Sequence, residues 1–382
     1  MYKIKLLNKI SPLGLSVLPS AKYICTEDMD APDGIIVRSA AMHDMEFGPE
    51  LLGIARAGAG VNNIPIEKCT EQGIAVFNTP GANANAVKEL AVLGLLMSAR
   101  KVFDGMKWAQ ELKGEGDNVP ALVEKGKANF TGPELTGKKL GLIGMGKIGA
   151  MLANIAIALG MEVYGYDPYL SPELAAKLLE GGVNRVDSLG EIYSQCDYIS
   201  LHSPSTKETK GMINAQAISG MKPGMRIINF ARGDLVNSGD VIAALDAGQL
   251  ASYLTDFPDE TLLGHSGVLA IPHLGASTPE SEENCAVMAA DQIREYLEHG
   301  NVINAINLPG LVVPPSGKSR VTVIYKGAAD TADKIAGLVS GSVNKAERGE
   351  IGYVLVELDG APSADIADKI KAVPGVMRVR QI

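Results

Sequence analysis

Cysteine is scarce in this chain of 382 residues, and its four copies are scattered at Cys25, Cys69, Cys196 and Cys285. None of them forms a C-x-x-C pair, so we expect neither a disulfide framework nor a structural zinc site, and no bound metal. No apolar run reaches the roughly 20 residues of a membrane-spanning helix, and residues 1–5 do not resemble a secretory signal peptide. These absences predict a cytoplasmic protein with no membrane partner.

Positive charge is also in deficit, because 35 lysines and arginines face 44 aspartates and glutamates, for a net charge of −9 at pH 7. A chain of this sign is not expected to bind nucleic acid or an anionic membrane surface. An anionic substrate would therefore need local basic residues. Hydrophobic residues make up 46% of the chain, which predicts ordered domains with a sizeable core, and the length suffices for two or three of them.

The order of apolar segments predicts an α/β protein. Residues 1–85 alternate short apolar strands with helices, as in a parallel sheet. A second series of strands begins near residue 140, and its later members lead into loops, where an open parallel sheet places its ligands; they are residues 198–202, 226–230, 252–257 and 268–271. Long helices are expected at about 85–100 and 279–299. Residues 114–133, with four glycines and two prolines, are expected to form a surface loop.

The end of the chain has a different pattern. Pro314-Pro315-Ser316-Gly317 is a linker signal. Residues 319–382 then have the order strand, helix, strand, strand, helix, strand, which predicts a small ferredoxin-like α+β module.

A glycine-rich turn opens the second series of strands. Residues 144–149 fit the G-x-G-x-x-G pattern, whose glycines permit a tight turn, a close approach to a pyrophosphate and close packing of helix on strand. The following helix would present free N–H groups to phosphates. Asp167 ends the next strand, 18 residues after Gly149 (167 − 149), where a carboxylate can bind the adenosine ribose. No arginine follows it to hold a 2′-phosphate, so the pattern favours NAD over NADP.

Three residues at strand ends could carry out oxidation of a hydroxy acid. Arg232 could hold a carboxylate by a bidentate pair, and His273 could take the hydroxyl proton near neutral pH. Glu260 could orient that imidazole and stabilise its charged form. Each also has a plainer interpretation, as a turn arginine, a solvated acid and a helix-capping histidine. His202, which also ends a strand, has no evident acid partner and is expected to line the cofactor site.

The ordered set of motifs resembles the D-2-hydroxyacid dehydrogenase family. The matching segments are 144–149, Asp167, 229–233, 256–260 and 272–278, together with 37–39 and 56–64 near the start of the chain. The resemblance implies catalysis by Arg232, Glu260 and His273. It also implies an NAD site made by Gly144, Gly146, Lys147, Ile148, Gly149, Asp167, His202, Phe230, Ala231, Arg232, Asp256, His273, Gly275 and Ala276. The substrate would be bound by Arg38, Ser39, Gly58, Ala59, Gly60 and Arg232.

The same resemblance implies a domain plan. Residues 1–90 and 284–308 would form a discontinuous, flavodoxin-like substrate domain, residues 91–283 a Rossmann-type NAD domain, and residues 318–382 an ACT-like module. The implied assembly is a homodimer or homotetramer. Asp256 is followed directly by Phe257, where the family usually has one residue more. The first loop of the module, residues 325–331, lacks the Asn and Pro-Gly of serine-regulated relatives, so weak or absent serine feedback is expected.

The pairing of this module with Arg38 favours a small, anionic, phosphorylated substrate, 3-phospho-D-glycerate, oxidised to 3-phosphohydroxypyruvate as the first step of phosphorylated serine biosynthesis. Two alternatives stay open. One is another D-2-hydroxyacid dehydrogenase, acting on glycerate, lactate or phosphoerythronate. The other is a non-catalytic, NAD-sensing corepressor, which the complete set of Arg232, Glu260 and His273 argues against.

Overall fold

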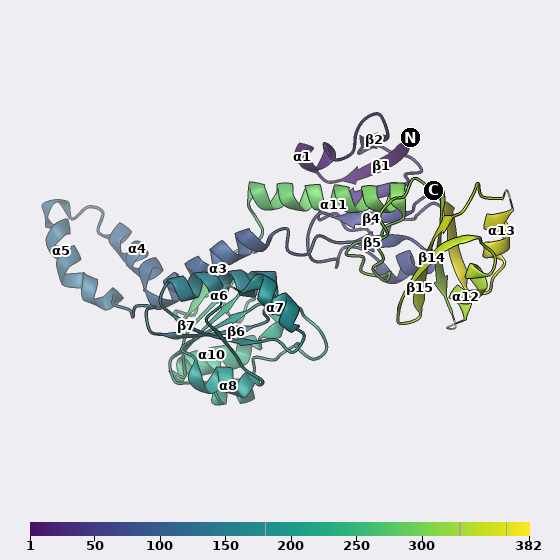
Figure 1. The fold of residues 1–382 in the computed structure, drawn as a ribbon. Coiled ribbons are helices and arrows are strands. Elements are labelled where there is room, and N and C mark those ends of the chain that lie inside the picture. Colours follow the sequence, from purple (N-terminus) through teal and green to yellow (C-terminus); the bar gives the residue numbers. More distant parts are fainter. Residues whose placement is uncertain (180, 328–329, 364) are drawn as a thin grey trace. The chain divides into compact units, whose positions relative to one another are not determined.

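The computed structural model describes residues 1–179, 181–327, 330–363 and 365–382. The chain divides into two compact units, which are described separately (Figure 1). Residues Ala84–Ser277 form the nucleotide unit, and Met1–Asn83 with Thr278–Ile382 form the discontinuous unit. The domain boundaries inferred above remain predictions.

The nucleotide unit is built on a seven-stranded parallel sheet of order β12-β11-β10-β9-β6-β7-β8. Strands β6 and β9 are almost entirely buried, as parallel strands covered by helices on both faces must be. The order reverses between β6 and β9, which is the topological switch point where such sheets bind ligands. The strands are β6 (Lys139–Ile143), β7 (Glu162–Tyr166), β8 (Val183–Arg185), β9 (Tyr198–Leu201), β10 (Met225–Asn229), β11 (Leu250–Thr255) and β12 (Val268–Ala270). The helices around them are α3 (Ala84–Ala99), α6 (Lys147–Ala158), α7 (Pro172–Leu178), α8 (Leu189–Gln195), α9 (Ala215–Ser219), α10 (Ser238–Asp246) and the 3-10 turn η3 (Gly233–Leu235).

The prediction of a surface loop at residues 114–133 is wrong, because most of this segment is helical. It contains the 3-10 turns η1 (Gly116–Asn118) and η2 (Lys127–Phe130) around α5 (Val119–Gly126), and it follows α4 (Val102–Glu111) (Figure 1). Two of the residues that suggested a loop, Pro120 and Gly126, are compatible with this helical structure. Pro120 lies in the first turn of α5, where proline is tolerated. A side chain at Gly126 would lie 2.3 Å from the Trp108 ring, so this glycine permits close packing.

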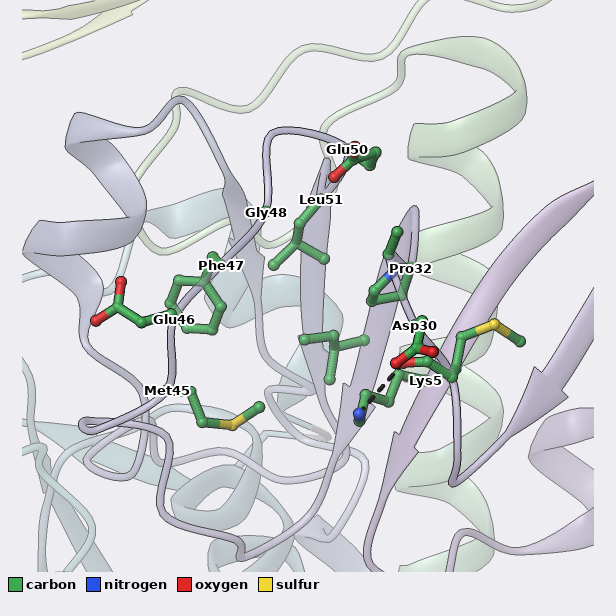
Figure 2. Close-up of a pocket in the computed structure, with 12 residues that line it drawn as sticks. Lys5, Asp30, Pro32, Met45, Glu46, Phe47, Gly48, Glu50 and Leu51 are labelled. Carbon is green, nitrogen blue, oxygen red and sulfur yellow. Dashed lines mark hydrogen bonds between the residues drawn. The ribbon is translucent and has the colours of Figure 1, made fainter.

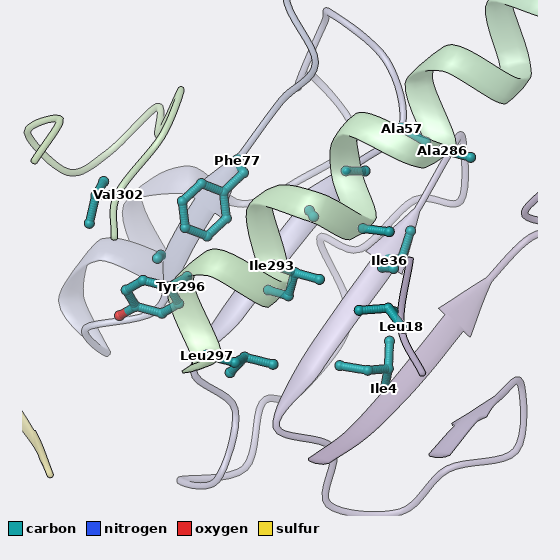
Figure 3. Close-up of a cluster of buried hydrophobic side chains, with 14 of the residues drawn as sticks. Ile4, Leu18, Ile36, Ala57, Phe77, Ala286, Ile293, Tyr296, Leu297 and Val302 are labelled. Carbon is teal, nitrogen blue, oxygen red and sulfur yellow. The ribbon is translucent and has the colours of Figure 1, made fainter. Parts of the chain in front are cut away.

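The discontinuous unit contains a five-stranded parallel sheet of order β2-β1-β3-β4-β5. The helix α11 packs on this sheet although it follows in the sequence about 200 residues later, and Ile293 and Tyr296 of α11 share one buried cluster with Ile4, Ile36 and Phe77 (Figure 3). The strands are β1 (Tyr2–Leu7), β2 (Tyr23–Thr26), β3 (Gly34–Val37), β4 (Gly53–Arg56) and β5 (Ala75–Phe77), and the helices are α1 (Pro12–Leu15), α2 (Ile66–Glu71) and α11 (Pro279–His299).

The C-terminal module confirms the predicted ferredoxin-like order of elements. Its antiparallel sheet has the order β14-β15-β13-β16. The module packs against the end of α11, where the guanidinium of Arg380 donates to the carbonyls of Tyr296 and Leu297, and the Tyr353 hydroxyl donates to Gly300 at 2.6 Å. The elements are β13 (Arg320–Lys326), α12 (Thr331–Ala336), β14 (Gly341–Arg348), β15 (Ile351–Leu358), α13 (Ile366–Lys371) and β16 (Val376–Gln381). The loop on which the serine prediction rests includes residues 328 and 329, which lie outside the described residues.

Candidate active site

The glycine turn between β6 and α6 leaves an open approach to a helix N-terminus. Gly144 has a φ of 96°, and a Cβ there would lie 2.7 Å from the carbonyl carbon of His202. A Cβ at Gly149 would lie 2.2 Å from the Gly144 carbonyl oxygen, so only glycine allows this contact of helix and turn. A Cβ at Gly146 would meet nothing within 4 Å. Among the residues that the structure describes, no side chain caps α6, so the N–H groups that follow Gly146 can bind an anion. Lys147 there is exposed and Ile148 is half-buried.

Asp167 is fixed directly beside this turn. One carboxylate oxygen accepts from the backbone N–H of Met145 and the other from that of Tyr169, each at 2.9 Å. The side chain of Tyr169 is 90% exposed. The carboxylate is thereby oriented at the end of β7, next to the glycine turn, which is the position that a ribose diol would require.

His202 lies at the switch point, one residue beyond β9. Its Nε2 is 2.9 Å from the Ser200 hydroxyl, and its backbone N–H donates to Ile143. Burial lowers the pKa of His202 to about 4. The imidazole is therefore neutral at pH 7 and adds no charge to the turn at Gly144 and Gly149.

A buried amide holds the turn that carries Arg232. Asn229 is fully buried at the end of β10; its Nδ2 donates to the Arg232 carbonyl and the Tyr253 hydroxyl, and its Oδ1 accepts from the Ala231 N–H. Phe230 is buried next to it, whereas the Arg232 side chain is exposed and donates to its neighbour's carbonyl. Asn229 thus presents the guanidinium at the strand end without itself reaching solvent.

Asp256, directly after β11, is a buried carboxylate with one oxygen in use. Its side chain is 1% exposed; Oδ2 accepts from the Gly275 N–H at 3.2 Å, and Oδ1 has no hydrogen-bond partner in the described chain. Burial raises the pKa of Asp256, and the charges of His273 and Arg232 act in the opposite direction. Asp256 therefore lies within the electrostatic field of both predicted catalytic residues, and it joins the loops after β11 and β12. Gly275 in the second loop is buried and Ala276 is half-buried.

His273 and Glu260 are both exposed on these loops. The His273 ring packs against Phe257, with centroids 4.6 Å apart. Neither side chain forms a hydrogen bond or ion pair with the other in the described residues, and the Glu260–His273 pairing remains a prediction.

The predicted substrate loops lie at the strand ends of the discontinuous unit. The side-chain oxygen of Asn8, a residue with a φ of 76°, accepts from the backbone N–H groups of Arg38, Ser39 and Ala40 at 2.8–3.3 Å. This amide therefore shapes the turn after β3. The guanidinium of Arg38 forms an ion pair with Glu282 in the first turn of α11.

Arg56 lies between the two predicted substrate loops. Its Nε donates to the Arg38 carbonyl at 3.0 Å and its Nη1 donates to the Gly60 carbonyl. A Cβ at Gly58 would lie 2.8 Å from Nη1, so Gly58 leaves room for the guanidinium against the backbone. The Ala59 carbonyl accepts from Asn78. Two arginines thus share one edge of this sheet, although sequence reasoning singled out only Arg38.

The family model for the D-isomer specific 2-hydroxyacid dehydrogenase, NAD binding domain, matches residues 92–275. Residues 92–275 belong to this family. The match covers the glycine turn, Asp167, Arg232, Asp256 and His273.

Curated relatives extend the similarity of this dehydrogenase domain to the rest of the chain. The D-3-phosphoglycerate dehydrogenase of Synechocystis sp. is 35% identical over 354 residues, covering 90% of this chain and 59% of that protein. The enzyme of the same name from Bacillus subtilis is 31% identical, covering 89% and 64%. The NAD⁺-bound 3-phosphoglycerate dehydrogenase structure from Entamoeba histolytica has a TM-score of 0.63 at 28% identity, covering 80% of this chain and 98% of that one. The chain spans about three fifths of the length of these two curated relatives.

The residues of the dehydrogenase domain fit NAD. The turn has an open face at Gly146, a carboxylate stands at the ribose position, and the buried Oδ1 of Asp256 lacks a donor that a carboxamide could supply. Within the described residues there is no cluster of three His, Cys, Asp or Glu that could hold a metal. None of the described helices is long and apolar enough to cross a membrane.

A cavity of about 300 Å³ in the discontinuous unit is separate from these residues (Figure 2). It is lined by the stem of Lys5, whose Nζ donates to the Met29 carbonyl, and by Asp30, Phe47 and Glu50. None of the predicted site residues lines it, and it plays no part in the function proposed below.

Two kinds of residue were missed by sequence reasoning. Asn229 and Asn8 hold the turns of Arg232 and Arg38 through backbone hydrogen bonds, and no motif at the sequence level identifies those partners. Arg56 could have been found, since it ends an apolar strand directly before a glycine-rich loop, as Arg38 ends the neighbouring one.

Proposed function

We propose that the chain is an NAD-dependent oxidoreductase that converts 3-phospho-D-glycerate into 3-phosphohydroxypyruvate, the first step of phosphorylated serine biosynthesis. The observation that carries the proposal is the grouping of Arg232, Asp256 and His273 at adjacent strand ends of the sheet that also holds the glycine turn. The names of the curated relatives support the choice of substrate.

In this mechanism Arg232 binds the substrate carboxylate through its planar fork and polarises the oxygen at C2. His273 accepts the proton of the C2 hydroxyl as the carbonyl forms, a role that contributes on the order of 10²–10⁴-fold. NAD, when bound, would supply the acceptor for the hydride that leaves C2. Glu260 stabilises the imidazolium that results, and the neutral His202 avoids competing for the proton.

Asp256 would hold the nicotinamide end of the cofactor. Its Oδ1, which has no partner in the described residues, would be available to the carboxamide, while Oδ2 accepts from the Gly275 N–H and keeps that loop in place. This assignment gives the buried acceptor a partner and explains why a carboxylate is retained in a site that raises its pKa.

We assign binding of the substrate phosphate to residues of the discontinuous unit. Arg38, Arg56 and the backbone N–H groups of residues 59 and 60 bind the phosphate oxygens, with Ser39 beside them. The N–H of Gly58, which was also expected to bind the substrate, already donates to the Arg56 carbonyl at 2.9 Å. The hydrogen bonds that hold Arg56 at the Gly60 loop support this placement.

An unphosphorylated substrate is a second candidate, because Glu282 already neutralises Arg38 in this structure. The assay that separates the candidates follows NADH absorbance with 3-phospho-D-glycerate, D-glycerate, D-lactate and 4-phospho-D-erythronate. The proposal expects kcat/KM to be highest for 3-phospho-D-glycerate, at least tenfold above D-glycerate. Equal or faster turnover of an unphosphorylated acid rejects it, and no turnover of any acid favours an NAD-sensing role.

For the rest of the chain we propose an ACT-like module that serves assembly of a homodimer or homotetramer in the cytoplasm, with weak serine feedback. Sedimentation velocity of the full chain tests the assembly. Titration of activity with serine tests the feedback, and strong inhibition at micromolar serine contradicts the second part.

A further inference from the structure

We propose that Glu282 is a built-in competitor for the substrate phosphate: its carboxylate occupies Arg38 in the ligand-free chain, and only an anion strong enough to displace it binds there. The inference rests on the proposed function for the identity of the substrate. Its physical content is the competition of two anions for one guanidinium. Glu282 therefore weakens phosphate binding, and it does so through Arg38.

The Arg38–Glu282 ion pair is exposed enough for an external anion to displace the Glu282 carboxylate. Arg38 Nη2 and Glu282 Oε1 are 2.5 Å apart, and both side chains are 43% exposed, so an anion from solvent can reach them. The backbone of Arg38 is fixed from both sides, since Asn8 binds its N–H and Arg56 its carbonyl. The guanidinium can therefore exchange partners without a change in the strand or the turn.

The helix does not need this ion pair for its own stability. Thr278 caps α11 by accepting from the Ser281 N–H, and Glu280 and Glu282 both lie in the first turn, where acidic residues favour the helix dipole. Glu280 is exposed and forms no ion pair or hydrogen bond among the described residues. One glutamate of this turn thus serves the dipole alone, whereas the other also binds Arg38.

A second arginine, Arg56, lies next to the Arg38–Glu282 ion pair. The buried thiol of Cys285, one turn further along α11, is influenced by both guanidiniums: burial raises its pKa, and the charges of Arg56 and Arg38 oppose that rise. Arg38 and Arg56 therefore face the same end of the helix.

Glu282 and a ligand anion exclude each other at Arg38. A phosphate must displace the carboxylate before it can bind this guanidinium, whereas a substrate that lacks the phosphate does not use Arg38. The ion pair therefore lowers the affinity for the phosphate and leaves the affinity for an unphosphorylated acid unchanged.

The test compares full-length wild type with Glu282→Gln, using inorganic phosphate as the probe at fixed ionic strength. Titration calorimetry should show about 2- to 5-fold tighter phosphate binding in the variant, as expected for loss of an exposed competing pair. The KM for 3-phospho-D-glycerate should fall by a similar factor, with kcat and the KM for D-glycerate unchanged. A purely structural role would instead alter kcat or both substrates.

Two matched variants complete the design. Glu280→Gln removes the same charge from the same helical turn and should leave phosphate binding unchanged. In an Arg38→Gln background, Glu282→Gln should not change phosphate binding, because the guanidinium for which the carboxylate and the phosphate compete is gone. Unchanged or weaker phosphate binding in Glu282→Gln, an equal gain in Glu280→Gln, or a gain that persists without Arg38 overturns the inference. Failure of the proposed function has a different readout: the wild type would not oxidise 3-phospho-D-glycerate, whatever the result of the phosphate titration.

Discussion

Asp256 offers a substitution whose effects on stability and on cofactor binding should have opposite signs. In Asp256→Asn the remaining carbonyl oxygen can still accept from the Gly275 N–H, while the buried charge is lost. Burial is the largest influence on the pKa of Asp256 and the net direction is upward, so the charges of Arg232 and His273 do not offset it. Because an unsatisfied buried charge costs more than the ~1–3 kcal/mol of a neutral group, we expect the cofactor-free variant to gain about 1 kcal/mol.

The same change should weaken cofactor binding. The Oδ1 atom, which has no partner among the described residues, is the proposed acceptor for the nicotinamide carboxamide, and asparagine would present an N–H group to another N–H group. Loss of one hydrogen bond to a charged group is worth about 1.5–3 kcal/mol, or roughly 10- to 150-fold in Kd. NADH fluorescence titration measures this loss, and scanning calorimetry without cofactor measures the gain in stability.

The stability difference should also depend on pH. The folded-state pKa of Asp256 lies above that of an aspartate in the unfolded chain, near 3.9. Its contribution to stability is therefore fully present below that pH and is lost as the pH rises through the folded-state pKa. Asparagine does not titrate, so the advantage of the variant should widen between pH 4 and pH 7.5. The exposed Asp117→Asn serves as control and should show no such trend. A variant less stable than wild type at pH 7.5, or one with unchanged NADH affinity, refutes this reasoning.

Three further substitutions test the predicted roles in the nucleotide unit. His273→Ala should lower kcat by about 10²–10⁴-fold in steady-state assays while the Kd for NADH stays within twofold; near-normal kcat excludes it as the base. Arg232→Lys should lower kcat/KM by about 10- to 150-fold, because a point charge cannot replace a bidentate fork worth about 1.5–3 kcal/mol, and a fall below threefold would reject the clamp. Asp167→Ala should reduce the ratio of kcat/KM for NAD over NADP at least about tenfold, and an unchanged ratio would assign cofactor choice elsewhere.

The parts of the fold that could be predicted from the sequence are those written in local patterns. The parallel strands, the glycine turn and the order of the C-terminal elements follow from apolar runs bounded by turn residues, and the structure confirms them. The helical segment at residues 116–130 was missed because its glycines and prolines indicate loops on average. Here Pro120 lies in the first turn of a helix and Gly126 makes room for Trp108, and that packing cannot be read from composition.

The candidate site divides in the same way. Arg232, Asp256 and His273 could be placed because each follows a recognisable strand, and strand ends of a parallel sheet meet at one edge. The Oδ2 contact of Asp256 with Gly275, and the ion pair of Arg38 with Glu282 across 244 positions, depend on how distant segments pack. Such contacts carry no local signal, so only the three-dimensional structure reveals which charges are already paired.

The division of the chain has a consequence for its synthesis. The nucleotide unit is continuous, so it can bury its core as soon as residue 277 is free, whereas strands β1 to β5 need α11 to cover them. The gap between Asn83 and Thr278 is 195 positions (278 − 83), which at ~5–20 residues per second is ~10–40 s of translation. Strands β1 to β5 are therefore covered only after the whole nucleotide unit has been made, and the interval of greatest exposure to aggregation falls on these strands rather than on the nucleotide unit.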